Sequence, residues 1–436
     1  MLITNPVVVS VIVMCALCLI NLNISLALLI AAIVAGLTAG MSVGGTMEIM
    51  IGGMGGNAET ALAYFLLGTF AVAINKTGLA AVACKRIARI VKGHKIVLMF
   101  ILAFIGVIAE TVVPVHIAFI PILVPPLLYL FNELKVDRRQ AACALAFGLK
   151  APYVALPVGF GLVFHGIVSA EMGKNGMEVA KNAVYAYTWI LGAGMLVGFL
   201  LAIFAAYNKP REYKDLPIAG GEGSMSETSD EFTKTHLMTL IAVIVAFGAQ
   251  LWTNSLPIGA LAAIIVMILT GALKWRQIDE SFMGGLEIMG LIAFVMLIAS
   301  GYGSVLRETK SVEQLVSAVA GMVGGSALGG AFIMLAVGLL VTMGIGTSFG
   351  TIPIIAAIYC PLGRLRGLSV GATVCLIAAA AALGDAGSPA SDTTLGPTAG
   401  LNADGQHNHI WGTCVPTFVF YNIPLFIAGM IGAVIF

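Results

Sequence analysis

Two aspartates and several hydroxyl side chains lie close together between long apolar runs near the end of the chain. The segment GDAGSPASDTT carries Asp385 and Asp392, with Ser388 and Thr393 beside them. Ionisable side chains at membrane depth are expensive, and by default they mark an ion path or a solute site. Carboxylate and hydroxyl oxygens suit a hard cation such as Na+, and the same carboxylates can hold a proton instead. The alternative is an extramembrane loop with solvated aspartates.

A second group of small polar residues interrupts the apolar run 328–362. Here the sequence GTSFGT places Thr347 and Ser348 directly after Gly346. We expect both hydroxyls to contribute ion ligands to the same cavity as the aspartates, with Gly346 beside the solute. Small residues also serve close helix packing, which is the alternative for this segment.

The first half of the chain carries a different set of polar residues at membrane depth. Glu110, Thr111 and His116 interrupt one apolar run, and Lys150 interrupts the next. Lys150 could oppose a solute carboxylate, or form an ion pair with Glu110 that opens and closes as ions bind. A lysine that extends its ammonium to the interface is the alternative. His116 could relay protons or could pack as a neutral side chain.

The composition explains why these residues must lie inside a membrane protein. Of 436 residues, 59% are hydrophobic and 10% are charged, and the mean hydropathy is +1.02, whereas an ordinary soluble domain is about 45–50% apolar and about 25% charged. The net charge is only +1, whereas a nucleic-acid binder needs an excess of basic residues. We therefore expect no nucleic-acid partner. Walker and HExxH motifs are absent, so we expect no enzyme and no ATP-driven pump.

The apolar runs predict an all-α polytopic fold of about ten transmembrane helices, two re-entrant hairpins and two broken helices. Two runs exceed one membrane span and carry polar or helix-breaking residues in the middle, which lipid cannot accommodate. The predicted hairpins cover about 96–131 and 328–362, and the predicted broken helices cover about 141–168 and 368–397. The segment KAPYVALP interrupts the first broken helix.

One offset of 232 residues relates landmarks in the two halves. Gly52-Gly53 matches Gly284-Gly285, Ile120-Pro121-Ile122 matches Ile352-Pro353-Ile354, Cys143 matches Cys375, and Pro157 matches Pro389. This pattern predicts a first repeat at 1–207, a linker at 208–235 and a second repeat at 236–436. An odd number of spans in each repeat would make the second repeat inverted relative to the first.

Basic residues predict the orientation in the membrane. They are concentrated in the loops that share a side with the charged linker 208–235, which makes that side cytoplasmic and places both termini outside. The N-terminus carries no transit peptide or cleavable signal, so a multi-pass position in a bacterial inner membrane is expected.

The polar motifs also resemble those of a known family. GDAGSPASDTT followed by His409-Ile410 is similar to the GD-x-x-SP-x-SDTT…HI pattern of NhaC-type Na+/H+ antiporters, and GTSFGT resembles their TGTSWGT. The wider pattern of hairpins and broken helices resembles the ion transporter superfamily. This resemblance implies ion and substrate sites at the hairpin tips and helix breaks, and it implies a homodimer.

KAPYVALP departs from the antiporters, because a second acidic motif is expected at that place. The positive charge of Lys150 and the aromatic ring of Tyr153 resemble a site for an amino-acid carboxylate more than the site of a bare cation exchanger. The chain is also similar to a bacterial branch suspected of amino-acid transport, with histidine among the candidate solutes.

We therefore expect an ion-coupled secondary active transporter that works by alternating access within the lipid bilayer. Its partners would be a small amino acid or related carboxylate and a coupling ion, Na+ or H+, with no other cofactor. If the ion is sodium, Asp385 and Asp392 would hold it. A Na+/H+ antiporter without an organic solute is the alternative.

Overall fold

The computed structural model describes residues 4–20, 22–91, 93–111, 120–217, 233–253, 255–311, 314 and 327–436. Throughout these residues the regular elements are helices, and no strand occurs among them. The prediction of an all-α fold is confirmed. Helices satisfy all their own backbone hydrogen bonds, which is what an apolar chain of this composition requires in lipid.

The helices fall into two sets on either side of residue 208. The first set is α1 (Pro6–Leu19), α2 (Ile24–Thr38), α3 (Val43–Gly53), α4 (Ala58–Thr77), α5 (Leu79–Val91), α6 (Lys95–Thr111), α7 (Ile120–Glu133), α8 (Arg138–Ala155), α9 (Phe160–Lys174) and α10 (Tyr185–Leu201). The second set is α11 (Lys234–Thr253), α12 (Leu256–Leu269), α13 (Ile278–Glu308), α15 (Ala327–Ile345), α16 (Ser348–Leu365), α17 (Val370–Ala382), α18 (Asp392–Leu401), α19 (Val415–Thr417) and α20 (Ile423–Ile435). Two π-helical turns, η6 (His409–Cys414) and η7 (Phe418–Asn422), flank α19.

Several helices begin at positions related by the offset of the sequence landmarks. Three such pairs of starting residues are Lys95 of α6 and Ala327 of α15, Arg138 of α8 and Val370 of α17, and Phe160 of α9 and Asp392 of α18. The order of elements is thus similar in the two halves. The division into repeats and the inversion of the second repeat stay predictions.

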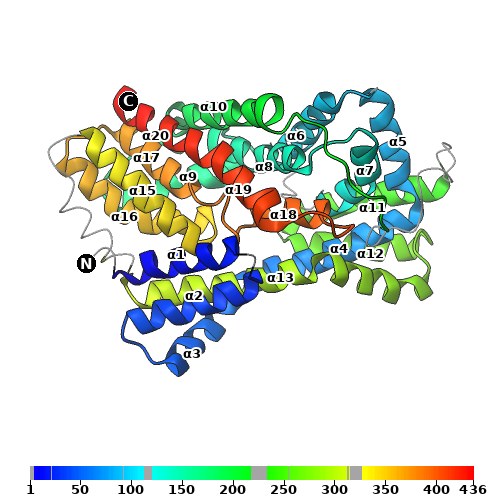
Figure 1. The fold of residues 1–436 in the computed structure, drawn as a ribbon, viewed down its shortest axis with the longest axis horizontal. Coiled ribbons are helices and arrows are strands. Elements are labelled where there is room, and N and C mark those ends of the chain that lie inside the picture. Colours follow the sequence, from blue (N-terminus) through cyan, green and yellow to red (C-terminus); the bar gives the residue numbers. More distant parts are fainter. Residues whose placement is uncertain are drawn as a thin grey trace.

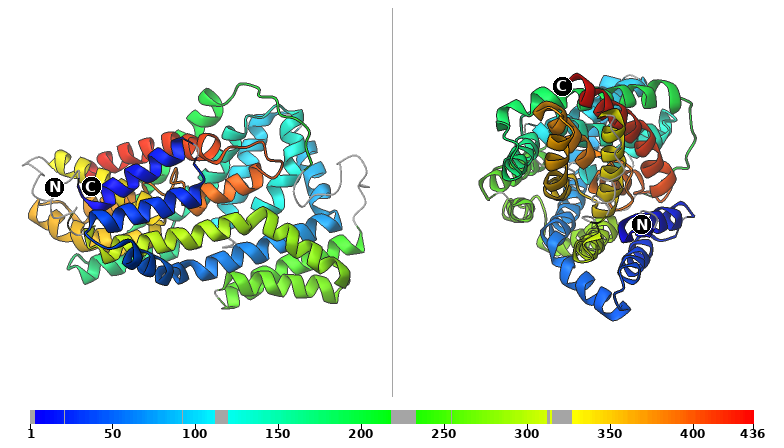
Figure 2. Two further views of the ribbon diagram at one scale, coloured as in Figure 1. Left: turned by 60° about the horizontal axis from the view of Figure 1, so that its bottom comes forward. Right: turned by 90° about the vertical axis from the view of Figure 1, so that its left-hand side faces the viewer.

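The paired glycine landmarks lie where α13 crosses the helices of the first half. A Cβ atom at Gly53 of α3 would lie 2.3 Å from Ser304 Oγ, and one at Gly285 of α13 would lie 2.3 Å from the backbone nitrogen of Thr69 in α4. Only a glycine lets the helices approach this closely. On the other side of this crossing, α2 packs against both α1 and α13 (Figure 2).

Two pairs of helices occupy opposite ends of the molecule. Helices α15 and α16 lie at the end that also holds both termini, and α6 and α7 lie at the other end (Figure 1). Only Gly346, with φ +76°, and Thr347 separate α15 from α16. The joint between α6 and α7, with His116, falls in 112–119, outside the described residues.

Each half also has a helix that stops and restarts. Helices α8 and α9 are bent by 46° at residues 156–159, and α17 and α18 are separated by residues 383–391. The first break lies later than KAPYVALP suggested, because α8 continues through Pro152 and Leu156 N still donates to Pro152 O at 2.8 Å. A Cβ at Gly159, where φ is +56°, would lie 2.1 Å from the carbonyl oxygen of Glu110, so this break packs on the end of α6.

The two halves exchange contacts around these breaks. Helix α9 packs against α16, and α18 packs against α7 and α8. Each restarted helix therefore lies against a helix from the other half. This crossing brings residues from both halves to the centre of the molecule.

Length and hydropathy mark several helices as able to cross a membrane. Within the described residues, three segments qualify alone: Lys181–Ala206, Met289–Glu308 and His409–Ile435. Two bent pairs also qualify when each is taken together, and they are α3 with α4 and α8 with α9. The other apolar helices are shorter, so the expected number of ten spans stays a prediction.

The first part of the linker, residues 208–217, is called the strap here. Its Lys214 pairs with the side-chain amide of Gln406, donating from N at 2.9 Å and accepting at O at 2.6 Å. Beneath it, both terminal nitrogens of Arg138 donate to the carboxylate of Asp404 at 2.5 Å, and the Tyr213 ring lies 4.3 Å from the guanidinium. The strap thus joins the start of α8 to the loop after α18.

Candidate functional site

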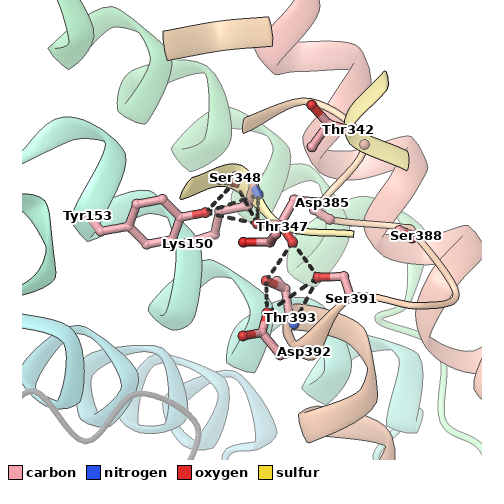
Figure 3. A network of polar contacts seen from close by, with 12 residues as sticks. Lys150, Tyr153, Thr342, Thr347, Ser348, Asp385, Ser388, Ser391, Asp392 and Thr393 are labelled. Carbon is pink, nitrogen blue, oxygen red and sulfur yellow. Dashed lines mark hydrogen bonds and ion pairs between the residues drawn. The ribbon is translucent and has the colours of Figure 1, made fainter. Parts of the chain in front are cut away.

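Four helix ends from both halves meet around one carboxylate (Figure 3). Asp385 lies in the break between α17 and α18 and is 3% exposed. Lys150 and Tyr153 reach it from α8, and Ser348, the first residue of α16, reaches it from the hairpin. The spacing of three residues places Lys150 and Tyr153 on one face of α8.

The Oδ2 atom of Asp385 accepts from three side chains. Lys150 Nζ is 2.6 Å away, Ser348 Oγ 2.8 Å and the Tyr153 hydroxyl 2.9 Å. Lys150 is fully buried. A buried ion pair needs such additional hydrogen bonds, because each charge has lost its water.

The Oδ1 atom of Asp385 faces a different group of oxygens. It accepts from the Ser391 hydroxyl, and Thr393 Oγ1 lies 3.5 Å from it. Both hydroxyls also lie 3.4 Å from Asp392 Oδ1. One side of the Asp385 carboxylate is therefore bound to an ammonium, and the other side belongs to a cluster of four oxygens, which we call the oxygen cluster.

Glycines and an asparagine keep the break open around Asp385. Gly384 and Gly387 have φ of +82° and +95°, a region that favours glycine. The side chain of Asn422, from η7, donates to Ala386 O at 2.6 Å and accepts from Gly384 N at 3.3 Å. These bonds satisfy Gly384 N and Ala386 O, which have no helical partners in the break. Buried backbone groups need such replacement partners.

Packing fixes the orientation of the side chains that reach Asp385. The ring of Tyr153 lies between Phe164 of α9 and Phe349 of α16, with ring centroids 5.4 Å away in both cases. Its hydroxyl therefore has little freedom to leave Asp385. At the start of α18, Ser391 accepts from Thr393 N at 3.1 Å and caps the helix.

The charges and spacing of this site suit one monovalent cation. Two carboxylates, Asp385 and Asp392, face one ammonium, Lys150, which leaves one negative charge. A hard cation with oxygens at about 2.4 Å has neighbouring octahedral ligands about 3.4 Å apart. The distances from both hydroxyls of the oxygen cluster to Asp392 Oδ1 and from Thr393 Oγ1 to Asp385 Oδ1 are close to this value, whereas Ser391 lies closer to Asp385. The N-termini of α16 and α18 also lie beside the carboxylates, and the partial positive charge of a helix N-terminus attracts an anion.

An apolar cavity of about 510 Å³ lies on another side of the same break. It is lined by α1 and α15, and it reaches Gly387, Pro389, Cys414 and Phe418. The break thus has a polar cluster and an apolar space beside it.

Comparison with known proteins identifies the family. A family model described as "Na+/H+ antiporter family" matches residues 144–430, and a second, described as "Na+-H+ antiporter family", matches residues 5–91. The chain belongs to the Na+/H+ antiporter family. The longer match includes every residue of the polar cluster around Asp385, by which we mean Lys150, Tyr153, Ser348, Asp385, Ser391, Asp392 and Thr393.

Relatives in this family align along the whole chain. A membrane protein of Vibrio parahaemolyticus is 48% identical, covering 99% of this chain and all of the relative. YuiF of Bacillus subtilis, named as a proposed amino acid transporter, is 45% identical over 99% of this chain and all of its own length. A Haemophilus influenzae membrane protein is 44% identical over 99% of each chain.

Two solved transporter structures are similar at a greater distance. Neisseria gonorrhoeae MtrF, described among a class of antimetabolite efflux pumps, is 16% identical over 89% of this chain and 84% of its own, with a TM-score of 0.41. The Alcanivorax borkumensis YdaH transporter is 14% identical over 88% of this chain and 86% of its own, with a TM-score of 0.44.

Within this antiporter-family chain, the structure brings together most of the residues expected to form the ion site. Asp385, Asp392, Thr393 and Ser348 lie in or beside the polar cluster. Ser388 instead donates to Met343 O at 3.3 Å, which attaches the break to α15.

Residues expected to bind solute have several different positions. Lys150 and Tyr153 reach Asp385, and Gly346 faces Ala390 of the break, since a Cβ there would lie 3.4 Å from its carbonyl oxygen. Glu110 is buried at the end of α6, where Thr111 donates to Val107 O at 2.7 Å. The sequence suggested Glu110 as the ion-pair partner of Lys150, and the structure gives Lys150 a different partner, Asp385.

Two contributors to the site were missed from the sequence. Asn422 holds the backbone of the break, and Thr398 contacts His409 at 2.8 Å beside it. Asn422 stands alone in an apolar run, which is a signal that a membrane protein sequence offers. Thr398 gave no comparable signal, because a threonine hydroxyl often bonds its own helix.

Proposed function

We propose that this chain couples the movement of one cation to the transport of a small amino acid or related carboxylate by alternating access. Its membership of a secondary transporter family supports the general class. The observation that carries the proposal is the buried contact of Lys150 with Asp385, in which an ammonium from one half and a carboxylate from the other share a helix break. Breaks of this kind provide binding groups at membrane depth.

In the proposed cycle, Na+ binds to the oxygen cluster and competes with Lys150 for Asp385. As the cation takes over the charge of Asp385, the ammonium is released toward the tip of α16. A solute carboxylate then pairs with Lys150, with Ser348 as a further hydrogen-bond donor, while Tyr153 stays bonded to Asp385. Na+ replaces the ammonium of Lys150 at Asp385, and the solute carboxylate replaces Asp385 at Lys150. Binding of one ligand therefore favours binding of the other.

The amino-acid part of the proposal draws on two observations. The name of the Bacillus subtilis relative YuiF proposes amino acid transport for that protein. The apolar cavity beside the break also lies within the range of about 300–1,000 Å³ found for small-molecule pockets, which would suit an apolar side chain. We further propose that the two halves are inverted repeats and that the linker 208–235 lies in the cytoplasm.

Na+/H+ antiport without an organic solute is the second candidate, and the family description favours it. In that cycle Lys150 would not meet a solute. Its ammonium would lose a proton when Na+ binds Asp385, because a buried lysine without a counter-charge is destabilised.

Transport in proteoliposomes separates the two candidates. We would add a mixed pool of labelled amino acids with an inward Na+ gradient, and separately with a pH gradient, and compare the chain with Asp385→Asn. Accumulation of one amino acid, lost in the variant, is the expected result. Na+-driven change of lumenal pH without accumulation would establish antiport. The absence of both activities would contradict both candidates.

A further inference from the structure

Two histidines near the end of α18 are joined by two threonine hydroxyls. His407 Nε2 lies 2.7 Å from Thr413 Oγ1, Thr413 Oγ1 lies 2.9 Å from Thr398 Oγ1, and Thr398 Oγ1 lies 2.8 Å from His409 Nδ1. Thr413 is fully buried and His407 is 6% exposed. These four side chains form an unbroken row of hydrogen bonds through the protein interior, which we call the relay.

The two ends of the relay lie at different places in the fold. At one end, His409 Nε2 is 3.0 Å from Pro389 O, inside the break that carries Asp385. At the other end, His407 lies in the loop 402–408, where its backbone N donates to Asn402 Oδ1 at 2.8 Å. The same loop contacts the strap through Gln406. The relay therefore runs from the helix break to the loop 402–408, which lies against the strap.

The donors and acceptors along the relay can be arranged in two directions. Each threonine hydroxyl donates one hydrogen bond and accepts others, and a neutral imidazole donates from one nitrogen and accepts at the other. In the first arrangement, His407 Nε2 donates to Thr413, Thr413 to Thr398, and Thr398 to His409 Nδ1. His409 Nε2 then donates to Pro389 O, which can only accept, and both histidines are neutral.

The second arrangement differs from the first by one proton. A proton that binds His407 Nδ1 allows the Nε2–H bond to break and its proton to join Thr413. The hydroxyl proton of Thr413 moves to Thr398, and the hydroxyl proton of Thr398 moves to His409 Nδ1. His407 ends neutral with a proton on Nδ1, and His409 ends as a cation that donates from both nitrogens, with Thr398 now donating to Thr413 as in the structure.

We infer that His407, Thr413, Thr398 and His409 move one proton between the strap side of the protein and His409 at the helix break, and that the charge this places on His409 sets the pH dependence of transport. The inference rests on the proposed function, because the proton adds a positive charge at the helix break where ions and solute are exchanged. Burial, together with the nearby Arg138, lowers the pKa of His407 to about 3. At neutral pH His407 therefore holds the extra proton only in passing.

Other titratable groups surround the relay. They are Arg138 of α8, Arg211 of the strap, Asp404 of the loop, Asp392 of α18, and the thiols Cys15 and Cys18 of α1 and Cys414 of η6. Arg138 and Asp404 form a mutual ion pair, so they contribute little net charge. Cys414 Sγ lies 3.4 Å from His409 Nε2.

The test breaks the relay at its hydroxyls and leaves its shape almost unchanged. Thr398→Val and Thr413→Val each remove one hydroxyl, and Thr398→Ser retains it. The matched control is Thr417→Val, since Thr417 is fully buried, as Thr413 is, but donates only to the backbone of Thr413 and Cys414. Uptake into proteoliposomes would be measured from pH 5 to 9, with solute affinity measured separately in detergent.

We expect both relay variants to slow the maximal rate at least about tenfold, as loss of a proton-transfer group does. Solute affinity should not change, the pH dependence should flatten, and Thr398→Ser should restore both rate and profile. Wild-type rates and profiles in both valine variants would overturn the inference, as would equal losses in Thr417→Val or in Thr398→Ser. If the wild-type chain transports neither solute nor Na+, the proposed function itself fails and the relay falls with it.

Discussion

Tyr153 and Asp385 are 232 residues apart in the chain, and the Tyr153 hydroxyl donates to Asp385 Oδ2 at 2.9 Å. The same offset relates the starts of the broken helices that carry them. When two halves are related by an axis, a residue and its counterpart can touch only close to that axis. If the two halves are inverted repeats, as we propose, the contact between Tyr153 and Asp385 lies close to their axis, where a rearrangement of one half against the other would change it most directly.

The two oxygens of Asp385 predict separate effects on ion and solute. Ser391→Ala removes a hydroxyl from the Oδ1 side, and Ser348→Ala removes one from the Oδ2 side. A hydrogen bond to a charged group contributes about 1.5–3 kcal/mol, so each loss should weaken binding by about ten- to a hundredfold. We expect Ser391→Ala to raise the KM for Na+ and Ser348→Ala to raise the KM for solute.

Uptake kinetics at varied Na+ and varied solute would measure this separation. Ser10→Ala is the matched control, because Ser10 is also fully buried but bonds Tyr302 at 2.8 Å, away from the break. If both site variants change the same KM, the carboxylate does not have an ion side and a solute side.

The ion pair of Lys150 and Asp385 predicts strong coupling between the two positions. Lys150→Met or Asp385→Leu alone leaves one buried charge without its partner, which costs about 3–5 kcal/mol. The double variant contains neither charge, so its thermal unfolding temperature in detergent should exceed that of at least one single variant. Transport should nevertheless be lost in all three. Additive losses of stability would show that the two charges do not depend on each other.

The general character of the fold was accessible from the sequence. Composition and apolar runs are enough to predict membrane helices, because lipid leaves few alternatives for a backbone. The glycines and prolines of 383–391 also indicated a break, and the aspartates there were singled out for their cost in an apolar surrounding. These features depend on local sequence alone.

Contacts between distant segments were harder to predict. Glu110 seemed a suitable partner for Lys150 because both lie in the first half, and nothing local indicates a partner 235 residues away. The end of α8 was also misplaced. Pro152 removes only one backbone donor, and the following turn keeps its bond from Leu156, so packing carries the helix past the proline.

Gly387 offers a test of the break that does not depend on transport. With φ at +95°, and with a Cβ that would lie 2.6 Å from the Cβ of Phe418, Gly387→Ala introduces both backbone strain and a clash. Gly405→Ala is the matched control, because its φ is +75° and no atom lies within 4 Å of the added Cβ.

Backbone strain alone costs about 1 kcal/mol, and overpacking adds about 1–3 kcal/mol. Thermal unfolding in detergent should therefore show a clearly larger loss for Gly387→Ala than for Gly405→Ala. Equal losses would mean that the contact with Phe418 yields easily, and that the break is less closely packed than the structure describes.

The ion pair of Arg138 and Asp404 predicts how stability depends on pH. Asp404 lies in the loop 402–408, outside the spanning helices. Burial raises the pKa of its carboxyl, but the hydrogen bonds and charge of Arg138 outweigh burial, so the pKa lies below its ordinary value. A carboxyl with a lowered pKa in the folded state stabilises the fold above its unfolded pKa of about 3.9. This contribution is lost as the pH falls through the folded-state pKa.

Asp404→Asn should therefore be less stable than the wild-type chain at pH 7, because Arg138 then stays buried without a counter-charge, at a cost of about 3–5 kcal/mol. The difference should shrink as the pH falls below about 4. Unfolding temperatures from tryptophan fluorescence between pH 3 and 7 would measure it. Glu212→Gln is the control, since Glu212 pairs with Lys135 in an exposed position, where ion pairs contribute little. A constant difference between the Asp404→Asn and wild-type curves at every pH would show that the carboxylate charge is not what holds Arg138 in place.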